Sequence, residues 1–67
     1  MKIITEMKIA KKGKLVTLDE KVPDSIKSKL CKIDEKVYFF ELLFELPSDL
    51  LIKTDDILVG KDVKFEI

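Results

Sequence analysis

Cys31 is the one side chain in this sequence that could serve as a strong nucleophile. A catalytic thiol needs a stabilised thiolate, usually beside a histidine base or another cation. The 67 residues contain no His, so only Lys27 and Lys32 could lie near Cys31. One Cys without any His also excludes a Cys/His zinc site and a disulfide within one chain. We therefore expect Cys31 to be a small helix residue that packs on a sheet, and we expect no catalytic residue.

Carboxylates occur in close pairs along the chain. The pairs are Asp19-Glu20, Asp34-Glu35, Asp55-Asp56 and, four residues apart, Glu41 and Glu45. Paired carboxylates act as acid and base only in a pocket that separates their pKa values, and so short a chain has a thin core with little room for one. Asp55-Asp56 also lacks the spaced ligands and the glycine of a calcium loop. We expect the adjacent pairs to lie in solvated turns, and we expect neither a metal nor another cofactor.

The two glycines and the basic residues limit which ligands are plausible. Gly13 and Gly60 are too few for a phosphate-binding glycine loop. The 13 basic residues are all Lys and are balanced by 13 acidic residues, so the net charge is zero. A broad nucleic-acid footprint needs a basic excess, and guanine edges are read most often by Arg. A nucleic-acid site nevertheless stays open at one lysine cluster, which could contact phosphates: Lys8, Lys11, Lys12 and Lys14.

Composition predicts one soluble domain, residues 1–67. Hydrophobic residues make up 46% and charged residues 39% of the chain, which suits a globular protein. The longest apolar segment, Val37–Leu46, contains two Glu and is too short to span a bilayer. The N-terminal residues have no signal-peptide core, and a lone Cys fits a reducing compartment. We expect a cytoplasmic protein with no membrane partner. Abundant Lys without Asn or Gln fits a thermophile and chance equally well.

Alternation of apolar and polar residues predicts a β-hairpin over the first 22 residues. The odd-numbered residues from Met1 to Ile9 share one face, and Val16, Leu18 and Val22 share another. Gly13 between the two strands can adopt the positive φ of a tight turn.

A short helix is predicted after this hairpin. Pro23, Asp24 and Ser25 favour a helix start. The apolar residues Ile26, Leu30 and Ile33 then recur at helical spacing, with Lys27, Lys29 and Lys32 on the wetter sides. We expect an amphipathic helix that packs on the sheet.

Val37–Leu46 fits two structures. As a strand it has one wholly apolar face: Tyr38, Phe40, Leu42, Phe44 and Leu46. As a helix it would bring Glu41 and Glu45 together one turn apart. The aromatic residues and the alternation favour a central strand, on which the two Glu would discourage edge pairing. Beyond the break at Pro47, we expect a helical turn within Leu50–Ile57, a turn at 60–62 and a closing strand with Val63, Phe65 and Ile67 alternating.

The second face of that strand is the candidate protein-binding surface. Val37, Phe39 and Leu43 would need a helix, another strand or a partner chain to cover them. If the short helix covers them incompletely, the remaining apolar patch marks an interface. The candidate interface residues are Val37, Phe39, Glu41, Leu43 and Glu45.

Two parts of the chain resemble known families. GKLVTLDEKVPDSIKSKL, residues Gly13–Leu30, resembles the ubiquitin-like β-grasp, with its Gly-Lys turn, its Thr-Leu strand end and its helix entered near Pro. The resemblance implies a compact binding module. The chain ends in Phe65-Glu66-Ile67 and not in Gly-Gly, so the resemblance does not extend to a conjugated modifier.

LPSDLLIKTDDILVGKDVKFEI, residues Leu46–Ile67, resembles the swapped-hairpin DNA-binding domain of the AbrB and MazE type, with MKIAKKGKLVTL as its leading strand. That resemblance implies a dimer that binds DNA through basic residues.

Together these observations predict an α+β domain: a mainly antiparallel sheet of about four strands with one short helix, similar to the β-grasp. The predicted function is non-enzymatic protein binding, as an adaptor, an inhibitor or a small subunit, with another protein or a second copy as partner. The alternative is a DNA-binding or antitoxin-type swapped-hairpin dimer.

Overall fold

A computed structural model describes residues 1–23, 26, 29–43 and 45–65, and these residues form an antiparallel β structure. The strands are β1 (Ile3–Ile9), β2 (Gly13–Leu18), β3 (Leu30–Ile33), β4 (Lys36–Leu42), β5 (Asp49–Ile52) and β6 (Lys64–Phe65). Their order in the sheet is β1-β2-β5-β4-β3-β6. Since β3, β4 and β5 pair in succession and β6 returns beside β3, the last four strands form a Greek key.

The sheet curls until its two ends meet. Lys2, just before β1, forms an isolated antiparallel bridge with Asp62, just before β6. The Val63 amide donates to the Met1 carbonyl at 2.7 Å, and the Ile3 amide donates to the Lys61 carbonyl at 2.9 Å. These bonds close the six strands into a small barrel, which leaves few unpaired backbone groups near this seam.

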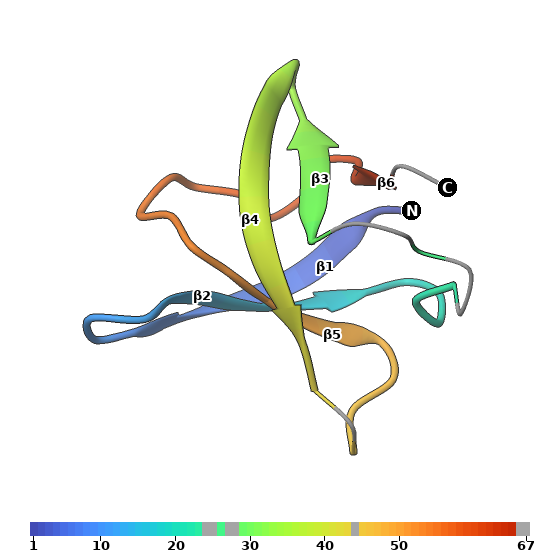
Figure 1. Cartoon of the computed structure of the whole chain (residues 1–67), viewed down its shortest axis with the longest axis horizontal. Helices are drawn as coiled ribbons and strands as arrows, with labels where there is room; N and C mark the ends of the chain where they lie inside the picture. The colour runs from blue at the N-terminus through green and yellow to red at the C-terminus, as the bar shows by residue number, and fades with distance from the viewer. Residues whose placement is uncertain (24–25, 27–28, 44, 66–67) are drawn as a thin grey trace.

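β4 is the strand that joins the two halves of this barrel. Its first residues pair with β3, from Lys36 opposite Ile33 to Phe39 opposite Leu30. Its last three residues pair with β5 instead. In Figure 1, β4 is accordingly a long bent strand that crosses the β1–β2–β5 layer. Phe40 lies at the change of partner, is 2% exposed, and packs edge to face on Phe65 with ring centroids 5.3 Å apart.

Buried apolar residues from every strand except β6, and from the two long connections, fill the barrel. The core cluster consists of Ile3, Val16, Leu18, Val22, Cys31, Ile33, Phe40, Leu50, Ile52, Leu58 and Val63, with Phe65 of β6 packed against it. No buried side-chain nitrogen or oxygen in the described part of the chain lacks a hydrogen-bond partner. The core therefore depends on apolar packing within a closed backbone ladder.

The N-terminal hairpin is confirmed, but its first strand carries a bulge that the alternation did not predict. The β1–β2 register shifts between Ile3 and Thr5. After the shift, Glu6 is opposite buried Val16 and so faces the barrel interior, whereas Met7 is 61% exposed. The predicted apolar face of β1 is therefore wrong beyond Ile3, because one extra residue reverses the side to which later residues point.

The α+β fold class is wrong, because the described residues contain no helix. Leu30 and Ile33, expected at helical spacing, lie in β3, and β3 pairs with β4 on one side and β6 on the other. Asp24, Ser25, Lys27 and Ser28 lie outside the described residues. The predicted sheet of about four strands is also wrong, because the described residues form six strands. The helix of the β-grasp resemblance is likewise absent from the described residues.

The later elements were predicted in part. The strand interpretation of Val37–Leu46 is confirmed over Lys36–Leu42, and β4 is central, so Glu41 does not guard a sheet edge. The expected helical turn from Leu50 is wrong, because Asp49–Ile52 is β5. The closing strand is confirmed as the two residues of β6, while Phe44 and Ile67 lie outside the described residues.

A two-residue turn positions β3 against β4. Asp34 and Glu35 join the strands with φ values of 49° and 68°. Two successive positive φ values are those of a type I′ turn, whose twist matches that of the paired strands.

Among the described residues, no helix is long and apolar enough to cross a membrane.

Candidate binding surface

The outer face of β3 and β4 carries two large apolar side chains that are exposed, Val37 and Phe39. Leu30 is opposite Phe39 and Lys32 is opposite Val37, while the alternate residues Cys31 and Ile33 point into the core. Directly opposed residues of antiparallel strands share a face. The outer face thus combines Leu30, Val37 and Phe39 in one apolar group, which we call the β3–β4 patch.

The side chains of this patch are unusually open to solvent. Phe39 is 65% exposed and Val37 is 62% exposed, although both lie within β4. A neighbouring hollow of about 290 Å³ extends from Val37 and Leu30 over Cys31 to Phe65 of β6. The exposed aromatic side chain could insert into a pocket of a partner, and the apolar hollow beside it could accept a side chain of that partner, as at protein interfaces.

Two lysines border the hollow. Lys32 of β3 is directly opposite Lys64 of β6, and both side chains are exposed. The ion pairs of the described residues involve neither of them. The hollow is therefore lined by apolar side chains and two positive charges.

The structure places three of the five predicted interface residues together. Val37, Phe39 and Glu41 follow one another on the outer face of β4, where Glu41 forms an ion pair with Lys53 at 3.5 Å. Leu43 and Glu45 come after the end of β4, so the alternation that grouped them with Phe39 no longer applies. Leu43 is half-buried and Glu45 is exposed in a turn.

The four lysines of the alternative nucleic-acid site differ in their surroundings. Lys8, Lys11 and Lys12 are exposed near the tip of the β1–β2 hairpin, which projects from the barrel in Figure 1. Lys14 is instead drawn into an ion pair with Glu6 at 2.7 Å, and its side chain is only 12% exposed. Three of the four lysines can therefore meet a ligand in solution, and the fourth is occupied.

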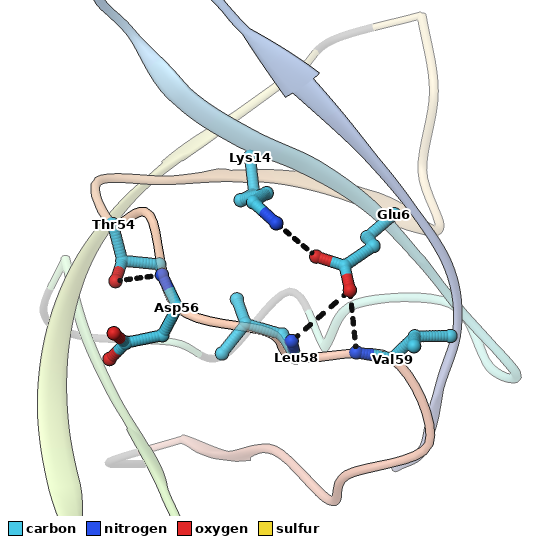
Figure 2. A network of polar contacts seen from close by, with 6 residues as sticks. All are labelled: Glu6, Lys14, Thr54, Asp56, Leu58 and Val59. Atoms are coloured by element: carbon cyan, nitrogen blue, oxygen red, sulfur yellow. Dashed lines mark hydrogen bonds and ion pairs between the residues drawn. The ribbon is translucent and has the colours of Figure 1, made fainter.

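Glu6 and Lys14 also hold the long connection between β5 and β6. Figure 2 shows the Glu6 carboxylate between the Lys14 ammonium group and the backbone of this connection. One carboxylate oxygen accepts the Lys14 bond, and the other accepts the amides of Leu58 and Val59 at 3.3 Å each. These donors lower the pKa of the Glu6 carboxyl below its ordinary value of 4.5, the Lys14 hydrogen bond contributing most.

The same connection is held to β4 through Tyr38. The Tyr38 hydroxyl donates to the Asp56 carboxylate at 2.7 Å, and the Asp56 amide donates to the Thr54 hydroxyl oxygen at 3.0 Å. The hydrogen bond to Asp56, aided by desolvation, raises the pKa of Tyr38 to about 12. At least one residue of each predicted carboxylate pair therefore has a structural partner. Asp34 pairs with Lys61 at 2.8 Å, Asp19 accepts the Lys2 amide at 3.0 Å, and Glu41 pairs with Lys53.

Cys31 lies in β3 and not on a helix as expected. It is 2% exposed, and its burial raises the pKa of the thiol to about 11. A thiol that is protonated at neutral pH and shielded from solvent is a poor nucleophile. The described residues also contain no group of three acidic or Cys side chains placed to hold a metal ion.

Sequence reasoning missed four residues around the β3–β4 patch: Leu30, Lys32, Lys64 and Phe65. The first two were assigned to a helix, so their pairing with β4 and β6 could not be deduced. The available signal was the alternation of buried Cys31 and Ile33 with Lys32, followed by a two-residue polar turn.

Comparison of the chain with known protein families, curated proteins and solved structures found no match.

Proposed function

We propose that this protein is a non-enzymatic binding module that contacts another protein through the β3–β4 patch. The observation that carries the proposal is the exposure of Phe39 and Val37, at 65% and 62%, beside the hollow lined by Leu30 and Phe65. Burying such side chains gains roughly 25 cal/mol per Å² of apolar surface removed from water. An apolar group of this kind on a sheet face is typical of an interaction site.

The size of the domain indicates how far such an interface would extend. A standard interface buries about 800 Å² on each partner, which is about one sixth of the 4778 Å² accessible surface of this chain. The β3–β4 patch would form its apolar centre. Polar neighbours such as Glu41 and Lys53 would lie at the rim, where contacts contribute less.

The ionisable groups give less support to an enzyme. Cys31 is buried with a raised pKa, and Tyr38 is occupied by Asp56. Glu6, the most shielded of the ion-paired carboxylates, is fully engaged in holding the β5–β6 connection. Cys31 is thus shielded from solvent, and Tyr38 and Glu6 have structural partners, whereas a catalytic acid or base must be free to exchange a proton with a substrate.

A second candidate function is nucleic-acid binding at the hairpin tip. Its supporting observation is the exposure of Lys8, Lys11 and Lys12 on a projecting hairpin. Three phosphate contacts would give weak binding that falls steeply with salt. The engagement of Lys14 by Glu6 reduces this cluster, so we rank the function second.

The proposal is tested by capture from an extract of the source cells with three immobilised proteins: the wild type, Phe39→Asp and Ile57→Asp. Ile57 is 70% exposed on the β5–β6 connection and is a matched control, since it is equally apolar and lies in a different element. We expect the wild type and Ile57→Asp to retain the same proteins and Phe39→Asp to lose them. If a folded Phe39→Asp variant retains the same proteins as the wild type, the proposal is overturned. If nuclease treatment abolishes retention and Phe39→Asp does not, the result favours the second candidate.

A further inference from the structure

The two lysines beside the hollow form a like-charge pair within the sheet. Lys32 and Lys64 occupy opposed positions on β3 and β6. Like charges directly opposite each other on paired strands are destabilising. No ion pair of the described residues offsets this repulsion, so the arrangement costs the folded chain stability.

The nearest acidic residues do not neutralise this pair. Lys32 and Lys64 also border a separate polar hollow of about 310 Å³ that includes Asp34, Glu35 and Asp62. Asp34 pairs with Lys61 at 2.8 Å and not with either of these lysines. Both ammonium groups thus remain available to a ligand on the side of the apolar hollow.

We infer that the β3–β4 patch and its hollow accept a polypeptide segment that carries a large apolar side chain next to one or more carboxylates. The inference rests on the proposed function and specifies the chemistry of the partner. The apolar side chain would enter the hollow over Val37 and Phe65 and pack beside Phe39. The neighbouring carboxylates would reach Lys32 and Lys64 and remove their mutual repulsion.

Charge complementarity selects this occupant. Among the described residues, the hollow is lined by four apolar or thiol side chains and two lysines, and by no acidic side chain. A basic segment would add a third positive charge beside an existing repulsion, which interfaces penalise strongly. A purely apolar segment would exclude water from the hollow without supplying a negative charge. The lower local dielectric constant would then increase the repulsion between the two ammonium groups.

The test uses a library of short random peptides, selected on the wild-type protein after depletion on Phe39→Ser. Enriched peptides are synthesised with a fluorophore, and their dissociation constants are measured by anisotropy. We expect sequences with Asp or Glu next to Phe, Trp or Leu. We expect the double variant Lys32→Glu/Lys64→Glu to bind them at least about tenfold more weakly, because two attractive contacts become repulsive.

The matched control is Lys11→Glu/Lys12→Glu, which makes the same change in net charge at the exposed hairpin tip. It should leave the dissociation constants unchanged. Peptides that lack acidic residues, or that bind Lys32→Glu/Lys64→Glu as well as the wild type, would overturn the inference and leave the proposed function standing. Failure to find any peptide that distinguishes the wild type from Phe39→Ser would overturn both.

Stability measurements test the premise separately from binding. In Lys32→Gln alone, the repulsion with Lys64 is removed and no negative charge is added beside Asp34, Glu35 and Asp62. The midpoint of urea unfolding should therefore rise while binding of acidic peptides weakens. A circular dichroism spectrum like that of the wild type verifies the fold of each variant. A lower unfolding midpoint in Lys32→Gln would overturn the premise that the two lysines repel each other.

Discussion

The Glu6 carboxylate and the Lys14 ammonium group lie 2.7 Å apart, with side chains only 14% and 12% exposed. The bulge in β1 turns Glu6 toward the interior, and the same carboxylate accepts the Leu58 and Val59 amides. One shielded side chain thereby joins the N-terminal hairpin to a connection more than fifty residues further along the chain.

Replacing Glu6 by Gln should destabilise the fold. The amide side chain cannot neutralise Lys14 and places a donor beside another donor, so we expect a loss of about 1–3 kcal/mol in the free energy of unfolding. Urea titration at neutral pH measures this change. The control is Glu20→Gln, at an exposed residue that takes part in none of the ion pairs of the described residues, and it should leave the stability unchanged. Equal stability of the two variants would contradict the structural role of Glu6.

The Glu6 carboxyl should also give the stability a specific dependence on pH. Because its pKa in the folded chain lies below the ordinary 4.5, its contribution is present above that value and is lost as pH falls through the folded pKa. We therefore expect the difference in stability between wild type and Glu6→Gln to shrink steadily below about pH 4.5. A constant difference down to the acid transition would show that the charge of Glu6 is not what stabilises the wild type.

Tyr38 is the only tyrosine, and the chain has no Trp, so phenolate absorbance reports its ionisation directly. We expect an apparent pKa of about 12 in the wild type, because ionisation would place two negative charges beside each other at Asp56. The Asp56→Asn variant should titrate closer to the ordinary value of 10.0. The contribution of this pair to stability should be complete between the ordinary Asp value of 3.8 and pH 10, and it should fall as pH rises toward 12. Identical titrations in both proteins would contradict the contact.

The two glycines offer a matched pair of alanine substitutions. Both have positive φ, 123° at Gly13 and 84° at Gly60, so alanine is strained at each. A Cβ at Gly13 would also collide with the Ile52 carbonyl oxygen, whereas the space around Gly60 is open. We expect Gly60→Ala to cost about 1 kcal/mol and Gly13→Ala to cost roughly 3 kcal/mol or more. Thermal unfolding that ranks them in the opposite order would contradict the close approach of β2 and β5.

Cys31 should resist modification while the chain is folded. Its burial and its pKa of about 11 leave little exposed thiolate at neutral pH. We expect an aromatic disulfide reagent to label it slowly in buffer and rapidly in urea, with a labelling rate that follows the opening of the fold. Rapid labelling of a folded, monodisperse sample would contradict its position in the core.

The sequence was most informative where its local patterns agreed with the final packing. Alternation around Gly13 predicted the first hairpin, and the aromatic alternation from Val37 predicted β4. β3 was missed because Ile26, Leu30 and Ile33 also satisfy helical spacing, and four residues of alternation are too few to outweigh it. β5 was missed because Leu50, Leu51 and Ile52 are all buried, which removes the alternation that marks a half-exposed strand.

The candidate surface was predictable only in part, because local patterns identify the residues of one strand and not the strands that pair with it. Val37 and Phe39 could be identified because they alternate with the core residues Tyr38 and Phe40 along one strand. Lys32 and Lys64 join them through pairing between segments that are distant in sequence. Such long-range pairing depends on tertiary context that no local pattern contains.

The most direct test of the central claim is photo-cross-linking in the source cells, with a photoreactive phenylalanine analogue placed at position 39 or, as control, at position 57. We expect covalent adducts with another polypeptide from position 39 and none from position 57, because the β3–β4 patch is the proposed contact. An adduct of twice the chain mass would identify a second copy of this chain as the partner. Absence of adducts at position 39, or equal adducts at both positions, would contradict binding through this patch.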